Sequence, residues 1–410
     1  MLKLSRELSN KIDVLLTYGW NRVAYNALRS LSSHGLNVAV GDISNKAMSK
    51  SSKYCACPFS YPSFYKNPKD FIESLKSTFQ IMKPSVYIPV HEEIFVVAKY
   101  INEFKDTGVI IPISDFQLLR SVHKKDCCAK IAESLGVSMP QTFKPKNISD
   151  LRSIWNEIGN RGKVVIKLLN TNSAKGVFYA TSYDNLLKIY TDLIGENNLK
   201  MEEYPIIQEY VSGDGYGVSL LFNNGKMRAR FTHKRLREKI ATGGTSTRRV
   251  SIKNPVIEEY AEHLLTSLKW HGVAMVEFKY NEEEKKGWLI EVNPRFWGSL
   301  ALPIKAGVDF PYLLYRMATD GDVETVTDYQ EGIVVRWILG DILATLSQIK
   351  AKRSVKPIFD FVSCKGESFD DLYKDDLMPF VTECFYYLSK FVKTASSNPT
   401  EGALLDVDKI

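Results

Sequence analysis

The alternation of apolar and polar stretches along the chain predicts a mixed α/β protein. From Asp13 the run DVLLTYG has the pattern of a buried strand that ends in a turn, a helical stretch follows around 26–33, and LNVAVGD has the pattern of a second strand. A strand, a helix and a strand in this order form a βαβ unit, which requires a parallel sheet. A further strand, SVYIPV, leads into the helical pattern of HEEIFVVAKYINEF. We therefore predict a Rossmann-like parallel α/β domain over residues 1–115.

The middle of the chain is predicted to consist of hairpins and intervening helices. KVVIKLLN and GVFYA flank a loop of small residues, and NNG separates SLLF from KMRARF. Asn-Gly between two strand patterns is a strong signal for a tight hairpin turn. A helix is expected at NPVIEEYAEHLLTSLKW, and two more strands flank NEEEKKG. In the first domain, the turn TYGWN lacks GxGxxG, so dinucleotide binding is not predicted.

The hairpin GVAMVEFKYNEEEKKGWLIEVNPRFWG brings carboxylates together. A register that is symmetric about Glu284 sets Glu277 opposite Glu291 and Met275 opposite Asn293, so the polar groups share one face. Two carboxylates side by side on adjacent strands repel each other unless a cation joins them. Oxygen ligands with few carboxylates suit Mg²⁺, which takes further ligands from water and phosphates. A solvated hairpin edge is the alternative, but the apolar neighbours of these residues require burial on the other face.

Composition excludes several classes of protein. The 410 residues are 44% hydrophobic and 25% charged, as expected for a water-soluble protein of two or three domains. The formal charge of +7 is mild and dispersed, so it is compatible with a small anionic substrate and does not predict nucleic-acid binding. We find no signal peptide and no membrane-spanning run, and the six cysteines have no zinc-binding spacing. We therefore expect a cytoplasmic protein without membrane contact, and a homodimer remains open.

Several short motifs together resemble a known superfamily. VEF and LIEVNPR resemble the metal-binding end of the ATP-grasp fold, as found in carbamoyl phosphate synthetase and biotin carboxylase. The likeness to the carbamoyl-phosphate-synthase-like branch runs from YIPVHEE through TGGTST and NPRFWGSL to KDDLMP. It implies an ATP-grasp fold over 116–325, made of two α+β subdomains that grip ATP. The first lobe would span 116–204 and the second lobe, with the metal site, 205–325. Residues 326–410 would form a C-terminal extension with a frayed tail.

The resemblance also implies ATP and Mg²⁺, or Mn²⁺, as cofactors and assigns roles by position. Glu277, Glu291 and Asn293 would hold the metal. Lys125, with Lys124 as the alternative, would open the central domain, and Lys167 would contact the phosphates. A lysine that closes an apolar strand before a loop is also a plausible point charge for phosphate on its own chemistry.

The remaining ATP contacts come from two short segments. The loop NTNSAKG resembles the loop that closes over the triphosphate, with Ser173, Lys175 and Gly176 as contacts. QEYV resembles the hinge at which a glutamate takes the adenine amino group while the next two backbone positions contact the ring. The residues matched to the hinge and to the ribose are Glu209, Tyr210, Val211, Asp214 and Tyr216, where Tyr216 departs from the acid of several relatives and Asp214 is the substitute.

A basic segment, FTHKRLREKIATGGTSTRR, is expected to face this site. A solvated face is the usual role of such a charge run, which holds Lys234, Arg235, Arg237, Arg248 and Arg249. The cluster GGTST favours more, because paired glycines and hydroxyls expose backbone donors to an anion. By resemblance, Arg235 and Arg295 would be the catalytic residues that neutralise the carboxylate substrate and its phosphorylated form.

The implied chemistry is the phosphorylation of a carboxylate by ATP, followed by capture of the acyl phosphate by an amine. Small carboxylates and amines would then be the substrates, and the protein would act by positioning and charge neutralisation. A carbamoyl-phosphate-type reaction on bicarbonate or carbamate is one alternative. A non-catalytic nucleotide-binding module is the other, although the full set of expected ligands is evidence against it.

Overall fold

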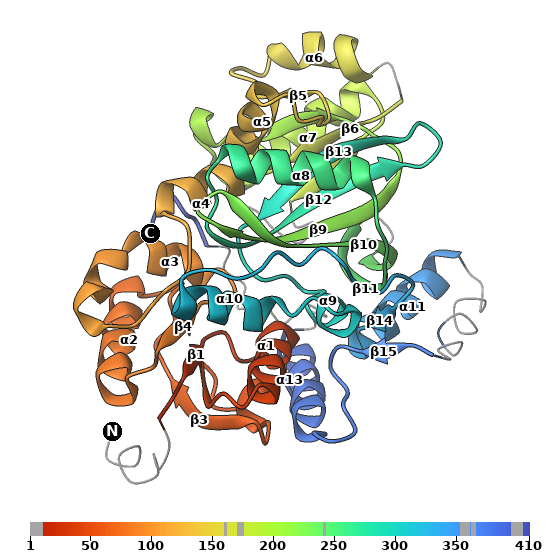
Figure 1. Cartoon of the computed structure of the whole chain (residues 1–410). Coiled ribbons are helices and arrows are strands. Elements are labelled where there is room, and N and C mark those ends of the chain that lie inside the picture. The colour runs from red at the N-terminus through yellow and green to blue at the C-terminus, as the bar shows by residue number, and fades with distance from the viewer. Residues whose placement is uncertain are drawn as a thin grey trace.

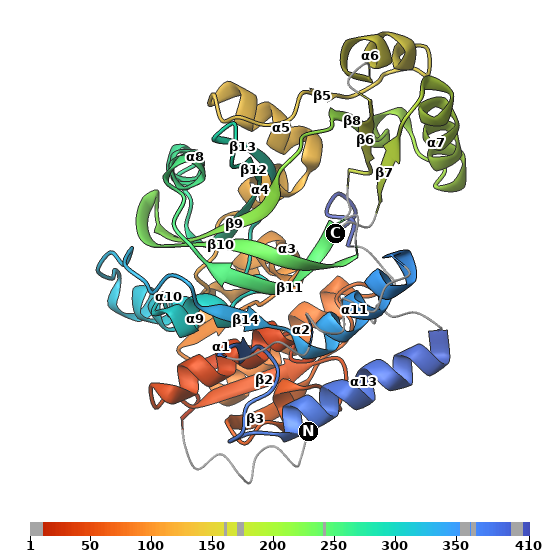
Figure 2. The same ribbon diagram turned by 90° about the vertical axis from the view of Figure 1, so that its right-hand side faces the viewer.

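The computed structural model describes residues 11–159, 162–169, 176–240, 243–352, 361, 366–394 and 405–410. Within these residues the strands form three sheets. A four-stranded sheet has the order β3-β2-β1-β4, a second four-stranded sheet has the order β5-β8-β6-β7, and a seven-stranded sheet has the order β13-β12-β9-β10-β11-β14-β15. Figure 1 shows the first of these at one end of the molecule, the second at the other end, and the large sheet between them. The view of Figure 2 shows the same three levels.

The N-terminal sheet is parallel throughout, as predicted. Its strands are β1 (Val14–Leu16), β2 (Val38–Asp42), β3 (Cys55–Ser60) and β4 (Val86–Ile88), and its helices are α1 (Arg22–Ser33), α2 (Pro68–Met82) and α3 (Glu93–Lys99). The Asn21 side chain accepts hydrogen bonds from the backbone N–H groups of Val23 and Ala24, which caps α1. The carboxyl ends of β1 and β4 lie side by side, because these two strands are neighbours in the sheet.

The second four-stranded sheet belongs to a small lobe with its own hydrophobic core. It contains β5 (Thr142–Phe143), β6 (Val164–Lys167), β7 (Val177–Ala180) and β8 (Ile206–Glu209), with α6 (Asp150–Ile158) and α7 (Tyr183–Glu196). The predicted hairpin of β6 and β7 is confirmed. The preceding helices, α4 (Phe116–His123) and α5 (Lys125–Ser134), place their buried residues in the larger core instead.

The large sheet contains the two other predicted hairpins, on either side of the turns NNG and NEEEKKG. Its strands are β9 (Asp214–Asn223), β10 (Lys226–Ile240), β11 (Gly243–Ser251), β12 (Gly272–Asn281), β13 (Lys286–Asn293), β14 (Val334–Arg336) and β15 (Ser368–Phe369). The turn between β9 and β10 is Asn224-Gly225, and both residues have positive φ angles, 48° and 85°. This is the backbone that a type I′ turn requires, so the NNG prediction is confirmed.

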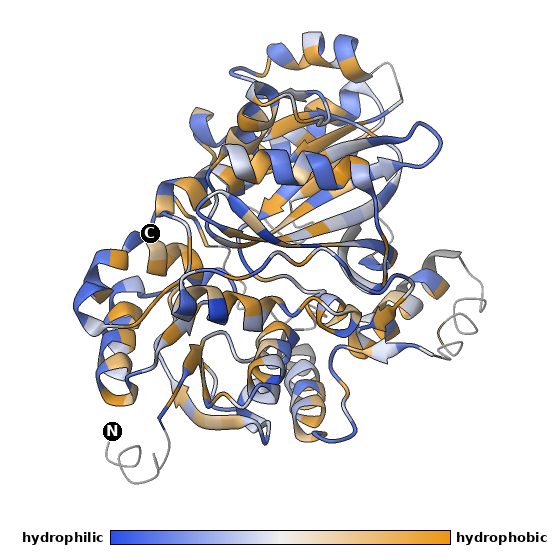
Figure 3. Ribbon diagram, viewed as in Figure 1, coloured by the Kyte–Doolittle hydropathy of each residue, from blue (hydrophilic) through white to orange (hydrophobic). Residues whose placement is uncertain are grey.

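Helices and loops surround the large sheet. They include α8 (Pro255–Ser267), which packs on β9, β10, β12 and β13, followed by α9 (Ala301–Ala306) and α10 (Phe310–Asp320). Figure 3 colours the strands behind α8 largely orange and the turn between β12 and β13 blue. The apolar face of the hairpin is therefore buried, as its sequence predicts, while its turn lies in solvent.

The C-terminal extension is more tightly bound than its sequence suggests. It contains α11 (Ile338–Lys352) and α13 (Met378–Thr394), and the acidic stretch between them holds Asp370 and Asp371, both with no exposed surface. Asp370 forms ion pairs with Arg22 of α1 and Arg249 of β11. The extension thus links the N-terminal domain to the large sheet.

The prediction of a frayed tail is wrong for residues 405–410. Leu405 and Val407 are buried in the larger core, and Asp408 pairs with Arg120 and with Lys124. The sequence of this short segment did not indicate these contacts, because the partners of Asp408 lie far away in the chain, in and next to α4.

Candidate functional site

The centre of the candidate site is the hairpin of β12 and β13. Glu277 pairs with Glu291 and Met275 pairs with Asn293, which is the register predicted from the sequence. A bulge follows Glu277, so that beyond it Phe278 pairs with Leu289 and the register is one residue away from the prediction. The predicted pairing of Glu277 with Glu291 is therefore confirmed, whereas the predicted register is wrong by one residue between the bulge and the turn.

Asn293 lies between the two carboxylates. Its Nδ2 donates to Oε1 of Glu277 at 3.0 Å and to Oε1 of Glu291 at 3.3 Å. The guanidinium of Arg235, from β10, forms an ion pair with Glu277 and a second one, at 3.1 Å, with Glu238. Three oxygen-bearing side chains and one cation therefore meet on a single face of the sheet.

Two lysines add positive charge opposite this face. Lys125 opens α5, and its Nζ donates to the carbonyl of Leu169 at 3.4 Å. Lys167 is the last residue of β6, and burial together with the nearby Lys125 lowers the pKa of Lys167 to about 8. Lys124 instead points to the C-terminus, where its Nζ lies 2.6 Å from Asp408. Of the two candidates at the start of the central domain, Lys125 is therefore the one that lies at the site.

The segment matched to the adenine hinge connects the small lobe to the large sheet. Glu209 ends β8, and its backbone N–H donates to the carbonyl of Gln141 at 2.9 Å. Tyr210 is partly exposed, with the Nζ of Lys163 lying 3.6 Å from its ring centroid, and Val211 is half-buried. These residues leave one lobe and enter the other, which is the position of a hinge.

The two residues matched to the ribose lie at the start of β9. Asp214 is exposed and forms an ion pair of 2.8 Å with Lys234. Tyr216 is fully buried, and its hydroxyl donates to Glu282. Tyr216 therefore has no exposed surface to offer a nucleotide, and Asp214 is the better candidate of the two.

The loop matched to the triphosphate cover lies mostly outside the described residues. Ser173 and Lys175 belong to that part, so nothing is added to their prediction. Gly176 is described and has a φ of 74°, a left-handed conformation that favours glycine. Its carbonyl accepts from the backbone N–H of Leu168 at 2.9 Å, which closes the base of the loop.

Arg295 lies beyond the end of the hairpin. Strand β13 ends at Asn293, and Pro294 separates it from Arg295. The guanidinium of Arg295 donates to the carbonyl of Phe296 at 2.9 Å and is half-buried. Its charge contributes to the lowering of the pKa of His91 and of His123, in each case after burial, so it lies close to both imidazoles.

Four residues of the site were not singled out from the sequence. Cys128 and His123 flank Lys125. Burial chiefly raises the pKa of Cys128 and lowers the pKa of His123, and the charge of Glu291 makes a smaller contribution to both. Glu238 pairs with Arg235, and His91 lies beside Arg295. The spacing of His123 and Cys128 around Lys125 on consecutive helices was a usable signal. His91 lies in the YIPVHEE motif of the resemblance, but no role had been assigned to it.

The basic segment does not form a solvated face. Arg237 pairs with Asp341, Arg248 with Glu367 and Arg249 with Asp370, all in the C-terminal extension. The GGTST cluster of the basic segment begins β11, which pairs with β10. Most of this charge therefore binds the extension, and Arg235 is the arginine of the segment that reaches the carboxylate pair.

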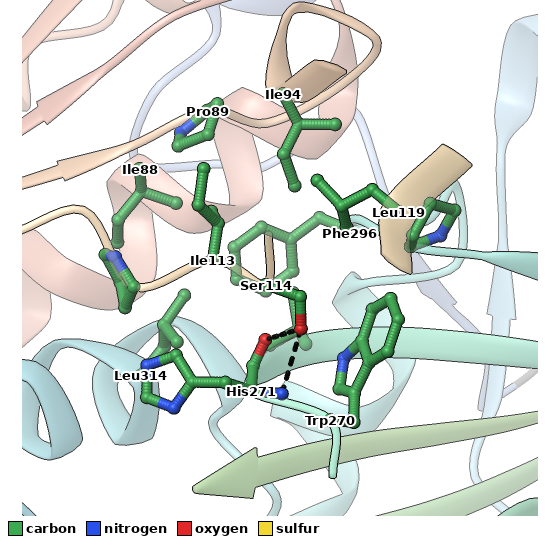
Figure 4. A pocket seen from close by; sticks show the side chains of 13 residues that line it. Ile88, Pro89, Ile94, Ile113, Ser114, Leu119, Trp270, His271, Phe296 and Leu314 are labelled. Atoms are coloured by element: carbon green, nitrogen blue, oxygen red, sulfur yellow. Dashed lines mark hydrogen bonds between the residues drawn. The ribbon is translucent and has the colours of Figure 1, made fainter. Parts of the chain in front are cut away.

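A small cavity lies near the site but is not part of it. Figure 4 shows it between the N-terminal domain and the large sheet, where Ser114 exchanges hydrogen bonds with the backbone of His271. Its volume is about 10 Å³, and its lining is mainly apolar, with Pro89 and Phe296 among the residues. A space of this size holds one water molecule at most.

The donor set on the hairpin fits a divalent cation. Glu277, Glu291 and Asn293 supply oxygen atoms on one face, which suits Mg²⁺ or Mn²⁺ better than a soft metal. In the part of the chain that the structure describes, no three histidine, cysteine or acidic side chains gather in a metal-binding group. A metal here would therefore complete its ligands from water or phosphate.

None of the described helices is long and apolar enough to cross a bilayer.

Known structures share this architecture. The biotin carboxylase domain of the Hydrogenobacter thermophilus 2-oxoglutarate carboxylase, solved with MgADP, ADP and bicarbonate, is 12% identical, with a TM-score of 0.65 over 79% of this chain and 74% of that one. The N5-carboxyaminoimidazole synthetase of Staphylococcus aureus, solved with ADP, is 15% identical, with a TM-score of 0.62 over 84% and 87%. The L-amino acid ligase of Bacillus licheniformis is 14% identical, with a TM-score of 0.57 over 76% and 75%.

These likenesses show that the chain has the ATP-grasp fold, preceded by a Rossmann-like domain. In sequence, residues 202–340 match a family described as "ATP-grasp in the biosynthetic pathway with Ter operon". That segment contains the residues matched to the adenine hinge, the carboxylate pair and both candidate catalytic arginines. No curated protein matches the chain in sequence.

Proposed function

We propose that this protein is an ATP-dependent ligase that joins a carboxylate to an amine. The observation that carries the proposal is the meeting of Glu277 and Glu291 on one face of the sheet, with Asn293 between them and the cations of Lys125 and Lys167 opposite. A buried acidic pair next to lysines suits a metal-bound triphosphate, whose negative charge both the metal and the lysines neutralise.

Each group has a role in the first half-reaction. Glu277, Glu291 and Asn293 would hold Mg²⁺ or Mn²⁺, which when bound supplies positive charge to the phosphates. Lys125 and Lys167 would bind the phosphates of ATP. An oxygen of the carboxylate substrate attacks the γ-phosphorus, the bond between that phosphorus and the bridging oxygen breaks, and ADP leaves with the electron pair.

Two arginines are suited to the charge that develops in this step. Arg235 comes from β10 beside Glu277, and Arg295 follows the metal-ligand strand by two residues. A guanidinium can bind two oxygens at once, so it stabilises a phosphoryl group better than an ammonium does. In the second half-reaction the amine nitrogen attacks the acyl carbon, phosphate leaves, and the nitrogen loses a proton.

The hinge completes the nucleotide proposal. Glu209 and the backbone at Tyr210 and Val211 would bind adenine, and Asp214 the ribose. The loop with Ser173, Lys175 and Gly176 would cover the triphosphate. The partly exposed Tyr210 and the position between two lobes support this assignment.

The test is a screen of small carboxylates with ATP and Mg²⁺, with hydroxylamine as the acceptor. Hydroxylamine captures an acyl phosphate as a hydroxamate, so the first half-reaction is detected before the natural amine is known. The expected result is hydroxamate and ADP in equal amounts with a defined set of carboxylates. ADP formation with bicarbonate alone would support the carbamoyl-phosphate-type alternative, and no ADP with any acid would contradict the proposal.

A further inference from the structure

The carboxyl ends of β1 and β4 form a topological switch point. From β1 the chain continues to β2 and β3 on one side of the sheet, whereas β4 lies on the other side of β1. In open parallel sheets, ligands bind in the crevice outside the strand ends at such a point. Figure 1 shows these two strands next to each other, at the side of the domain that faces α9 and α10.

The segment from Arg295 to Gly298, which follows β13, lies across this switch point. Gly298 lies against Arg22, which follows β1, because a Cβ on Gly298 would be 2.9 Å from Nη2 of that arginine. At the other end, Arg295 lies close enough to His91, which follows β4, to act on its pKa. A substrate carboxylate bound at Arg295 would therefore lie near His91, which follows β4.

Tyr18, directly after the loop residue Thr17, has an unusual backbone conformation. Its φ is 62°, a left-handed value that is rare and strained for an aromatic residue. The N–H of Tyr18 donates to the hydroxyl of Tyr61 at 2.8 Å. Its ring stacks on His91, with the centroids 4.4 Å apart and the planes 2° from parallel. The strain is thus used to hold one aromatic face against the imidazole.

Polar groups surround this stack. The Tyr65 hydroxyl donates to Oε2 of Glu92 at 2.8 Å and lies 3.4 Å from the Tyr18 hydroxyl. Burial, and after it the charge of Glu92, raises the pKa of Tyr18, so its hydroxyl keeps its proton. Nδ1 of His91 is buried without a hydrogen-bond partner among the described residues. We call Tyr18, Tyr65, His91 and Glu92 the switch-point cluster.

We propose that the switch-point cluster binds the ammonium group of an amino substrate, a proposal that rests on the ligase function above and names the chemistry of its substrate. A carboxylate flanked by aromatic rings attracts a cation, and the free Nδ1 of a neutral imidazole can accept a hydrogen bond from it. Arg295 attracts negative charge a short distance away. The site is thus suited to a molecule with an amino group at one end and a carboxylate or acyl phosphate at the other.

His91 meets the requirement for this role. Burial, followed by the charge of Arg295, lowers the pKa of His91 well below its ordinary value, so the imidazole is neutral near pH 7. His91 and Tyr65 are half-buried, while Glu92 and Tyr18 are buried, so the cluster keeps a partly exposed side. The ammonium would reach the cluster from the side of His91 and Tyr65, because Glu92 and Tyr18 are buried.

The test measures binding directly, by calorimetry with the full chain near pH 7. The probes are ethanolamine and the proteinogenic L-amino acids without a basic side chain, each compared with its N-acetyl derivative, which lacks the cation, and putrescine, compared with its N,N′-diacetyl derivative. At least one amino probe should bind, its N-acetyl derivative should bind on the order of tenfold more weakly, and Glu92→Gln should reduce binding of the amino probe by a similar factor. Tyr65→Phe, which only removes the hydroxyl that donates to Glu92, should weaken binding less.

Glu103→Gln is the matched control, because Glu103 is an exposed acid of the same domain that pairs with Lys76. It should bind the amino probe as the wild type does. The inference is overturned if no amino probe binds better than its N-acetyl derivative, or if Glu92→Gln binds equally well while its melting temperature is normal. Amine binding without hydroxamate formation would contradict the ligase function and leave the ammonium site supported.

The hydroxamate assay separates two sources of the ammonium. If it belongs to the carboxylate substrate, Glu92→Gln raises the KM for that acid with hydroxylamine as acceptor. If it belongs to the second substrate, hydroxamate formation keeps its KM and only the KM for the amine rises. Either shift supports the cluster as an ammonium site, and the absence of both contradicts it.

Discussion

Glu277 and Glu291 lie opposite each other in the same hairpin, yet the pKa values of their carboxyl groups are shifted in opposite directions. Burial raises the pKa of Glu277, because this effect exceeds that of its ion pair with Arg235. Burial alone would also raise the pKa of Glu291, but Lys125, Arg235 and Lys167 together hold it below its usual value. One acid is thus neutralised mainly by an arginine of its own sheet, and the other mainly by lysines from the opposite side. A metal-bound triphosphate would meet charges from both directions.

Glu291→Gln should remove ATP turnover while the protein remains folded. The amide keeps the shape of the side chain and loses the negative charge that a divalent cation requires. We expect turnover to fall on the order of 100-fold or more at ordinary Mg²⁺. Glu284→Gln, at the exposed hairpin turn, is the matched control and should be neutral. Undiminished turnover in Glu291→Gln would rule out this metal site.

ATP binding should weaken as the pH rises above about 8, where Lys167 loses its proton. The pKa of Lys167 is lowered in the folded protein, so the lysine is charged below that value and neutral above it. The Kd for ATP should then rise towards about tenfold per pH unit. Lys167→Arg keeps its charge at every pH, so the weakening of ATP binding above about pH 8 should be smaller in this variant than in the wild type. Parallel profiles for the two proteins would exclude Lys167 as the titrating phosphate contact.

Arg295→Lys should separate turnover from nucleotide affinity. The single ammonium of lysine cannot bind two oxygens of the developing acyl phosphate. The activation free energy should therefore rise by about 2–4 kcal/mol, and turnover should fall accordingly. ATP affinity should change little, because Arg295 lies beyond Asn293, the last of the three residues proposed to hold the metal. Turnover, ATP binding and melting temperature are measured on one preparation. A joint loss of ATP binding and turnover would assign Arg295 to the nucleotide site instead.

The hinge predicts a preference among nucleotides. If Glu209 accepts from the adenine amino group and the backbone at Val211 binds the ring edge, ATP should be used in preference to GTP, whose ring presents the opposite pattern of donors and acceptors. Competition between the two nucleotides for binding measures the preference directly. Equal affinity would remove Glu209 from the adenine site.

Asp370→Ala should strongly destabilise the protein. Asp370 has no exposed surface and pairs with both Arg22 and Arg249, so its removal leaves buried guanidinium charge uncompensated. We expect a loss of about 3–5 kcal/mol in the free energy of unfolding, measured with urea. Asp320→Ala removes an exposed pair with Arg316 and should cost less than about 1 kcal/mol. Similar losses in the two variants would contradict the structural role of the buried pair.

Features that depend on neighbouring residues were predictable from the sequence. The hairpin register that faces Glu277 with Glu291 follows from the symmetry of one polar turn, and the Asn224-Gly225 turn follows from residues that accept positive φ. The bulge after Glu277 was not predictable. It depends on how β12 fits two different partners, β13 and β9, at the same time.

The amino-acid sequence by itself thus determined the parallel first domain, the hairpins and the residues around which a nucleotide site could form. Only the tertiary structure decided that Arg249 binds Asp370, that Leu405 enters the larger core and that His91 lies beside Arg295. These contacts join segments that are far apart in the chain. Periodicity reports which face of an element is buried, but whether a charge is solvated, paired or directed at a ligand depends on the partner that burial brings to it.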